Sequence, residues 1–279
     1  MSLRAGAFPP LLKAFRARRG MSQLQLAQVS GYSQRHISFL EIGRSRPTRG
    51  AVLNLAEVIC DSLEERNAML RAAKFSDEYP RSPLDAEELQ RVLATCQRTL
   101  DGLSPFPAIL LDARWEVLAL NSAAIAFFGQ FQRERRWEGG ERNAMRTHFE
   151  PGGLRPHILD WPRVALHFMT KVRLRLLNEP SNDVAVGIVR DFGEEVSALA
   201  PERSGPSGRE GAAFTIELAL GATNYRYQTL FAAMSDPQDR TAEDLRIEAF
   251  VPADDQTRRH FEGLGGVAQS EQRAPKRRA

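Results

Sequence analysis

Apolar residues in the first 75 positions recur at the three- and four-residue spacing of short amphipathic helices. Serine or threonine precedes several of these runs and glycine follows them, and these residues are typical start and stop signals of helices. Ser22 and Ser62 also stand three residues before Gln25 and Glu65, which is the spacing of a capping box. The pattern predicts five short helices, near residues 10–19, 22–29, 33–41, 48–59 and 62–73.

Beyond Phe75 the hydrophobic pattern changes twice. After the polar break SDEYPRSP, an apolar stripe predicts a connecting helix over residues 85–102, which could pack on the same chain or pair with a second copy. From Pro105, apolar runs predict strands separated by helices, and this order predicts an α+β domain with one antiparallel sheet. The strands are a hairpin in FPAILLDARWEVLALN and three runs in AFTIELAL, YRYQTLFAAM and LRIEAFV, whereas SAAIAFFG and residues 161–178 predict helices and DVAVGIVRDFGEEV fits either.

Composition indicates a folded protein with more than one domain. The chain has 279 residues, of which 42% are apolar and 26% are charged. Its two cysteines, Cys60 and Cys96, belong to no CxxC or Cys/His cluster, so neither a disulfide framework nor a zinc site is predicted. No run approaches the ~20 apolar residues of a membrane span, and charges interrupt the region where a signal peptide has its apolar core. We therefore expect a cytoplasmic protein that does not bind a membrane.

Charge is unevenly distributed, although the whole chain carries a net charge of only +3. Residues 1–60 contain nine Lys or Arg against two acids, Glu41 and Glu57, which gives +7 and leaves −4 for the remainder. A basic head on a mildly acidic body is typical of a polyanion-binding module joined to a second domain.

The predicted helix at 33–41 has one large side chain that its apolar spacing does not explain. Ile37 and Leu40 can share a buried face, but at roughly 100° per residue Phe39 lies about 100° from Leu40 and about 160° from Ile37. Phe39 therefore points outward, together with Arg35 and Ser38. On the outside of the helix it could contact a thymine methyl group in DNA, or it could cover the next helix.

Residues 22–41 combine two helices with a tight turn at Gly31, the unit that places a second helix in the DNA major groove. Gln34, at the edge of the outward face, and the neighbouring arginine are side chains suited to base edges. The basic residues Arg44, Arg46 and Arg49 follow the helix and would contact phosphates. The alternative is an arbitrary helical bundle in which these charges form a solvated face.

The pattern from Ser22 to Pro47, S-Q-x-x-L-A-x-x-S-G-x-S-x-x-x-I-S-x-x-E-x-G-R-S-R-P, resembles the XRE, or phage-repressor-like, helix-turn-helix domains. The resemblance implies an all-α five-helix fold that binds DNA, in which Gln34 reads a base and Gln23 bonds a phosphate while buttressing Gln34. It also implies an inward ion pair between Arg16 and Glu41. The predicted DNA-binding residues are Gln23, Ser33, Gln34, Arg35, Ser38, Phe39, Arg44, Arg46 and Arg49.

A longer resemblance is to the MmyB-like subgroup of these regulators. It is carried by RHISFLEIGRSRPTRGAVLNLAEV, ERNAMLRAAKFSDEYPRSPLD, PFPAILLDARWEVLALNSAA, FEPGGLRPHILDW and LRIEAFVPADDQTRRHF. It implies that the second domain is a PAS-like ligand-binding domain, a class in which fatty acid has been found as ligand. Two departures are visible: Lys74 stands where the subgroup usually has glycine, and residues 134–142 are unusually charged. The predicted domains are 1–75 (helix-turn-helix), 76–104 (linker with connecting helix), 105–262 (ligand-binding) and 263–279 (disordered basic tail).

A PAS-like domain encloses a small molecule between its sheet and the covering helices, in a mostly apolar site. The residues that could line it also fit a plain core: Phe106, Ile109, Leu111, Phe127, Phe128, Trp161, Phe168, Leu218, Phe231 and Phe250. An acyl ligand would need one cation to neutralise its carboxylate, because an unpaired buried charge is costly. Arg155 and His148 are the candidates. The predicted ligand-binding residues are therefore His148, Arg155, Trp161, Phe127 and Phe231.

The sequence as a whole predicts a transcription regulator that binds double-stranded operator DNA as a homodimer and senses a hydrophobic small molecule, for example a fatty acid. The alternative is that the C-terminal domain serves as a dimerisation or protein-partner module without a ligand. No catalysis is expected, because the histidines lack HExxH spacing and no serine stands in GxSxG. No cofactor or metal is predicted.

Overall fold

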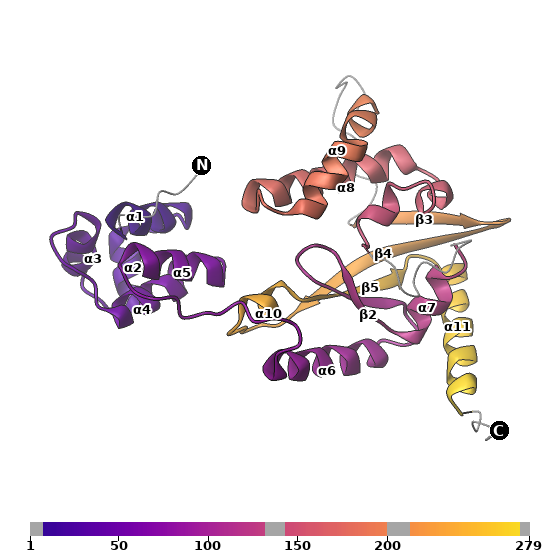
Figure 1. Ribbon diagram of the computed structural model, residues 1–279, viewed down its shortest axis with the longest axis horizontal. Helices are drawn as coiled ribbons and strands as arrows, with labels where there is room; N and C mark the ends of the chain where they lie inside the picture. The colour runs from indigo at the N-terminus through magenta and orange to yellow at the C-terminus, as the bar shows by residue number, and fades with distance from the viewer. Residues whose placement is uncertain (1–7, 132–142, 200–212, 274–279) are drawn as a thin grey trace. The chain divides into compact units, whose positions relative to one another are not determined.

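The computed structural model describes residues 8–131, 143–199 and 213–273 (Figure 1). The chain divides into two compact units, and each unit consists of two separate stretches of the sequence. The N-terminal unit combines residues 1–89 with residues 234–243, and the C-terminal unit contains residues 90–233 and 244–279. A short segment of the second half of the chain therefore belongs to the first unit.

The N-terminal unit contains the five predicted helices, each within two residues of its expected bounds. They are α1 (Phe8–Arg18), α2 (Gln23–Ser30), α3 (Gln34–Glu41), α4 (Arg49–Ile59) and α5 (Leu63–Ala72). One side of every helix packs into a common core, in which Leu12, Leu26, Ile37, Leu55 and Leu70 are fully buried. The helical fold follows from the three- and four-residue spacing of these side chains.

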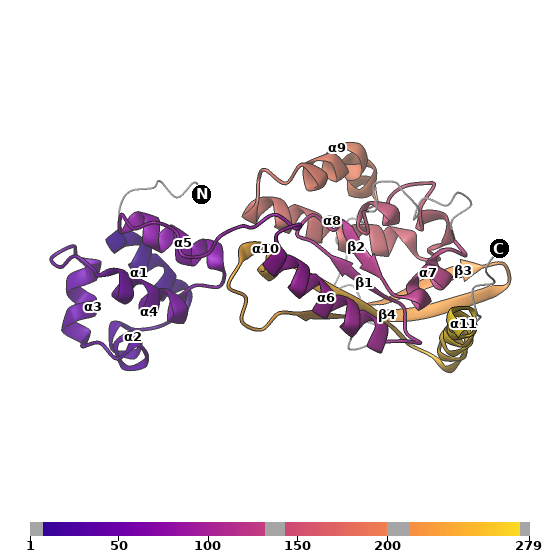
Figure 2. The same cartoon turned by 60° about the horizontal axis from the view of Figure 1, so that its bottom comes forward.

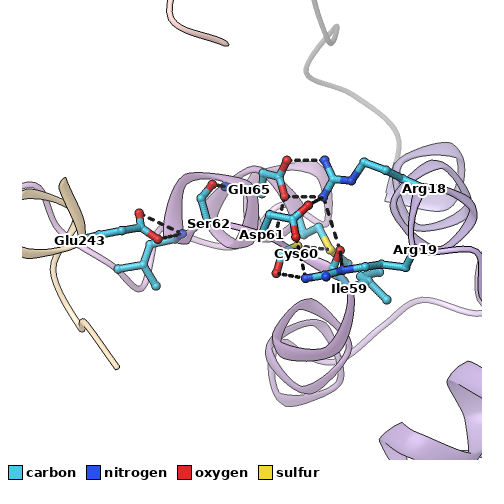
Figure 3. A network of polar contacts seen from close by, with 10 residues as sticks. Arg18, Arg19, Ile59, Cys60, Asp61, Ser62, Glu65 and Glu243 are labelled. Carbon is cyan, nitrogen blue, oxygen red and sulfur yellow. Dashed lines mark hydrogen bonds and ion pairs between the residues drawn. The ribbon is translucent and has the colours of Figure 1, made fainter. Parts of the chain in front are cut away.

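One of the two predicted capping boxes is present and the other is half formed. At Ser22, the hydroxyl accepts from the Gln25 amide and the Gln25 side chain accepts from the Ser22 amide. At Ser62, the hydroxyl accepts from the Glu65 amide, but the Glu65 carboxylate accepts instead from the amide of Asp61 (Figure 3). The prediction of the second box is therefore wrong in that half, and the guanidinium of Arg18 also binds the Glu65 carboxylate, 2.5 Å away.

Lys74 stands where the family usually has glycine, and its backbone conformation shows why glycine is favoured there. Helix α5 ends at Ala72, and Lys74 follows in the left-handed region at φ 66°. Glycine adopts this conformation without strain, whereas a side chain makes it cost about 1 kcal/mol or more. The helix stop is therefore kept in spite of the lysine.

The C-terminal unit is built on one antiparallel sheet of five strands. They are β1 (Ala108–Leu111), β2 (Val117–Leu120), β3 (Thr215–Leu220), β4 (Thr223–Ala233) and β5 (Arg246–Pro252), in the order β2-β1-β5-β4-β3. Helix α6 (Glu87–Gly102) lies on one face of the sheet, and α8 (Trp161–Asn178) and α9 (Asp183–Ala198) lie over the other (Figures 1 and 2). This arrangement confirms the predicted α+β fold.

Pairing in the sheet decides which side chains face α8 and α9. Glu248 of β5 pairs with Ile109 of β1 on one side and with Phe231 of β4 on the other, so all three side chains share a face. That face carries the large apolar core of the unit. Residues between them, such as Ile247 and Ala249, point to the face covered by α6 and are buried as well.

Short helices and the C-terminus complete the unit. Helix α7 (Ser122–Phe128), capped by Asn121, packs against α11 (Asp255–Arg273) at one end of the sheet. The five-residue α10 (Arg240–Asp244) follows β4, and its residues 240–243 belong to the N-terminal unit. Helix α11 continues beyond Gly263, where the sequence predicts disorder. The charged segment 134–142 and residues 202–211 lie outside the described residues. No helix in the described ranges is long and apolar enough to cross a membrane.

Candidate functional site

The turn between α2 and α3 sets the direction of the candidate recognition helix. Gly31 ends α2 in the left-handed conformation at φ 76°, and its amide donates to the carbonyl of Ala27. Ser33 then caps α3, because its hydroxyl accepts from the His36 amide at 3.1 Å. The predicted role of Ser33 near DNA therefore accompanies a structural role at the start of the helix.

The outer face of α3 presents the predicted base-reading residues together. Gln34 and Arg35 are exposed, and Ser38 and Phe39 are partly exposed. The guanidinium carbon of Arg35 lies 5.1 Å from the centre of the Phe39 ring. This cation–π contact, between residues one helical turn apart, explains the outward position of the Phe39 ring, because the ring supports the Arg35 side chain on the surface.

Arg16 and Glu41 form the predicted inward ion pair, and Gln23 joins it. Arg16 binds the two carboxylate oxygens of Glu41 through Nε and Nη2, at 2.5 and 2.9 Å, and the side chains are 13% and 2% exposed. Gln23 donates from Nε2 to the same carboxylate at 2.8 Å. Burial alone would raise the pKa of Glu41, but the hydrogen bonds from Arg16 and Gln23 hold it below its ordinary value. Among the described residues, Gln23 makes no hydrogen bond to Gln34.

The three arginines after α3 differ in what they can offer to DNA. Arg44 and Arg46 are exposed in the segment between α3 and α4. Arg49, at the start of α4, is instead bound to the carbonyl of Ser76 at 2.8 Å and forms an ion pair with Glu78. A phosphate contact by Arg49 would have to replace that ion pair, so Arg44 and Arg46 are the better placed of the three.

In the C-terminal unit, Arg155 and Trp161 contact each other, and their polar groups are bound within the chain. The Arg155 guanidinium lies 3.8 Å from the centre of the Trp161 ring and binds Glu195 at 2.5 and 3.0 Å. The indole of Trp161 donates to the carbonyl of His148 at 2.9 Å. Arg155 thus already has a carboxylate partner within the chain.

His148 is partly buried, and its low pKa leaves it neutral at physiological pH. Its Nδ1 lies 2.8 Å from the carbonyl of Ala144, and its ring packs edge-on against Phe168 at 4.4 Å. Burial lowers the pKa of His148 to about 4. An uncharged imidazole can bond a polar group but cannot neutralise a carboxylate by charge.

The remaining predicted ligand residues lie in different surroundings. Phe127 is fully buried in an aromatic cluster with Phe131, Tyr225 and Phe261. Phe231 is 55% exposed near the end of β4. The structure therefore does not gather the five predicted residues at one point.

A cluster of charged side chains on the α8-facing side of the sheet was missed from the sequence. The ammonium of Lys171 on α8 lies 5.4 Å from the ring centre of Phe168 and 5.8 Å from that of Phe231, and the guanidinium of Arg246 lies 6.0 Å from Phe231. Glu248 is the strand partner of Phe231. Burial raises the pKa of the Glu248 carboxyl to about 7, against the opposing effect of Arg246 and Lys171.

Two polar atoms in this region lack hydrogen bonds. The hydroxyl of the fully buried Tyr227 and Nε of Arg246 have no hydrogen-bond partner within the described chain. Burial lowers the pKa values of Lys171 and Arg246, with Glu248 partly offsetting the effect. Unsatisfied donors and partly buried cations beside apolar rings are features that a ligand with a polar end would complete. We refer to Lys171, Tyr227, Arg246 and Glu248 as the inner polar cluster.

The inner polar cluster had only a weak signal in the sequence. Arg246 and Glu248 alternate with Ile247 and Ala249, a pattern that normally puts the charged residues in water. Here both faces of the sheet are covered by helices, so the alternation does not separate inside from outside. Among the described residues, no group of three or more His, Cys, Asp or Glu side chains could hold a metal ion.

Comparison with protein families agrees with this division of the chain. Residues 92–264 match the model of the MmyB-like transcription regulator ligand binding domain, and residues 10–69 match a helix-turn-helix domain. The first match alone covers more than half of the chain. No curated protein matches it.

Proposed function

Because this chain belongs to the MmyB-like transcription regulators, we propose that it reads operator DNA with α3 and responds to a hydrophobic small molecule bearing an acidic group. The DNA-binding part of the proposal is supported above all by one observation. The residues suited to base edges, Gln34 and Arg35, are exposed on the same helix whose other side, through Ile37 and Leu40, belongs to the core.

The proposed reading divides base contacts from phosphate contacts. Gln34 and Arg35 would bond base edges in the major groove, while Arg44 and Arg46 would bind phosphates just beyond the helix. Two copies in a homodimer would present two α3 helices to half-sites about 34 Å apart, so the operator would be nearly palindromic.

The DNA proposal is tested on a duplex selected from a random library by the full chain. Gln34→Ala and Arg35→Ala should each lose about 1–3 kcal/mol on this duplex and relax the preference at one base pair. Arg46→Ala should weaken selected and random DNA alike and reduce the salt slope by about one. Equal losses on both DNAs for all three variants would contradict the assignment of α3.

The ligand proposal is supported by the inner polar cluster. Lys171 and Arg246 supply positive charge beside the rings of Phe168 and Phe231. The cations would bind the acidic end of a ligand, and the rings would contact its apolar chain. This changes the expected cation: Arg155 is already paired with Glu195 and His148 is neutral. A PAS-like enclosure between the sheet and α8 is the arrangement we propose for the bound molecule.

Mass spectrometry of the purified full chain tests this proposal, since native and denaturing spectra together show whether a small molecule co-purifies. Dodecanoate and its neutral methyl ester are suitable probes, and we expect the acid to bind about tenfold more tightly because only the acid has a charge to neutralise. Lys171→Met should remove most of that preference, whereas the matched change Arg173→Met, on the outer side of the same helix, should not. Equal binding of acid and ester by the unmodified chain would contradict the proposed anchor.

A second function for the C-terminal unit is favoured by one observation. Among the large apolar side chains that are more than half exposed on it, four lie on α8 and β4: Leu174, Leu177, Leu230 and Phe231. Exposed apolar groups of this size often mark contacts with other chains. Under this alternative the chain dimerises or binds a partner through these residues without any ligand, and Leu174→Ser with Leu177→Ser would lower the mass measured by light scattering.

A further inference from the structure

The loop that joins β4 to β5 leaves the sheet and belongs to the N-terminal unit. The last pair of the ladder is Ala233 with Arg246, and the residues between them include 234–243, which are grouped with residues 1–89. We call residues 234–243 the arm. An ordinary hairpin loop would make its hydrogen bonds within its own sheet, whereas the arm makes them with residues of the N-terminal unit.

The arm is bound to the segment after α5 by several polar contacts. The amide of Arg240 donates to the carbonyl of Pro80 at 2.8 Å, and the hydroxyl of Thr241 donates to the carbonyl of Ser82 at 2.6 Å. In return, the Ser82 amide donates to the Asp239 carboxylate at 3.0 Å. The arm and residues 80–82 thus satisfy each other's backbone groups.

The arm also supplies a hydrogen-bond acceptor at the N-terminus of α5, in addition to the cap by Ser62. The Leu63 amide, one of the donors that a helix start leaves without a partner, donates to both carboxylate oxygens of Glu243, at 2.9 and 3.2 Å (Figure 3). A carboxylate at this position is also favoured by the helix dipole. Next to it, Arg240 forms an ion pair of 2.5 Å with Glu64.

The same end of α5 is connected to α1. Arg18 binds Glu65 and Asp61, and Arg19 binds Asp61 at 2.7 Å (Figure 3). The start of α5 is therefore a junction at which the arm and α1 meet. A change in the arm would therefore alter contacts of α5, which is bound to α1 through these ion pairs.

Both ends of the arm join strands next to the inner polar cluster. Phe231 lies three residues before the arm begins, and Arg246 lies three residues after Glu243. Asp244, the first residue after the arm, lies 3.9 Å from Arg175, which follows Lys171 by one turn of α8. Because β4 and β5 are paired as far as Ala233 and Arg246, the arm is attached at both ends to the strands that carry Phe231 and Glu248.

We propose that residues 234–243 are a coupling arm, through which the occupancy of the inner polar cluster changes the DNA affinity of the N-terminal unit. The ligand in this statement is that of the proposed function, but the mechanical link is independent of its identity. Ligand and DNA would influence each other through the position of Glu243 at the start of α5.

The contact itself is tested by amide hydrogen exchange in the full chain. The arm variant, Arg240→Ala with Thr241→Val and Glu243→Ala, should exchange the Leu63 amide about tenfold faster, because that amide loses its acceptor. The matched control is Ser235→Ala with Asp236→Asn in the same loop, where the two side chains bond each other. The control should leave the exchange rate at Leu63 unchanged, and equal rates in arm variant and wild type would overturn the proposal.

Coupling is tested by a double-mutant cycle that needs no ligand. Phe231→Ala perturbs the root of the arm and should change affinity for the selected duplex by about threefold or more in the otherwise native chain. In the arm variant the same substitution should change it by less than about 1.5-fold. Equal changes in both backgrounds, or no change in either, would overturn the coupling arm.

The outcome is separable from that of the ligand proposal. If no small molecule co-purifies and dodecanoate does not bind, the ligand proposal fails while the cycle still measures the link between the units. If the arm variant unfolds, Glu243→Gln replaces it in the double-mutant cycle, because the amide oxygen can still accept from Leu63 while the charge that favours the helix start is lost. This variant should lose at least half of the effect of Phe231→Ala, and retention of the full effect overturns the proposal.

Discussion

The guanidinium of Arg16 holds the carboxylate of Glu41 by two hydrogen bonds, with Gln23 as a third donor, at the C-terminal end of α3. The pair fixes α3 relative to α1 on the side away from the surface that we assign to DNA. Its carboxylate is only 2% exposed, so each partner depends on the other for its solvation.

Glu41→Gln should therefore destabilise the N-terminal unit by about 3–5 kcal/mol, since it leaves the buried Arg16 without an opposite charge. Urea denaturation of the full chain measures the loss. Asp77→Asn, which breaks the exposed ion pair with Arg71, is the control and should cost less than about 1 kcal/mol. Because the pKa of Glu41 is lowered in the fold, the stabilisation is present above its ordinary value of 4.5 and is lost as the pH falls below it.

Phe39→Ala distinguishes the two uses of the outward ring. We expect a loss of preference for thymine at one operator position, by about 1 kcal/mol, with little change in the melting temperature, because the ring is partly exposed beneath Arg35. Binding to single-base variants of the selected duplex gives the first quantity and calorimetry the second. A lowered melting temperature with unchanged base preference would instead assign the ring to covering α4. Val29→Ala, at another exposed apolar side chain, controls for surface truncation.

Lys74→Gly should stabilise the N-terminal unit by up to about 1 kcal/mol. The change removes the strain of a side chain at φ 66°, although the greater freedom of glycine in the unfolded chain takes back part of the gain. Lys74→Ala removes the same charge and keeps the strain, so its free energy of unfolding should stay at the wild-type value or below. A gain of equal size in both variants would show that charge, and not backbone geometry, matters here.

Glu248→Gln should remove a fall in stability of the C-terminal unit between about pH 4.5 and pH 7. The folded pKa of Glu248 is raised to about 7, so the native state binds more protons than the unfolded chain in this window, and stability decreases as the pH rises through it. The full effect is roughly 3 kcal/mol. His148, whose pKa is lowered to about 4, acts in the opposite direction, so the difference between variant and wild type is the informative quantity. An unchanged slope in the variant would contradict this account.

Local patterns predicted the elements of both units because each depends on neighbours in the sequence. The helix starts after Ser22 and Ser62 follow from capping, and the strand in AFTIELAL follows from alternation within eight residues. The ion pair of Arg16 and Glu41 was predicted through a family resemblance, not through spacing. Contacts between distant residues had no such support: Arg49 meets Glu78 across 29 positions, and that partner decides how free the arginine is.

The ligand side shows the same limit more sharply. Lys171, Tyr227 and Glu248 come from three separate elements, and only the strand pairing and the placement of α8 bring them to one face. Arg155 was a reasonable cation by composition, but its charge is already matched by Glu195. Which cation is left for a ligand depends on all the other pairs of the fold.

The hydrogen bonds from the Leu63 amide to Glu243 have a consequence for the order in which the protein is made. The two residues are 180 positions apart, so a ribosome must synthesise most of the chain after α5 before the acceptor for that amide exists. At common elongation rates of about 5–20 residues per second, the delay is roughly 10–40 seconds. During that interval the nascent DNA-binding unit has all five helices but an incomplete α5 terminus, and it reaches its final form only when the β4–β5 hairpin emerges.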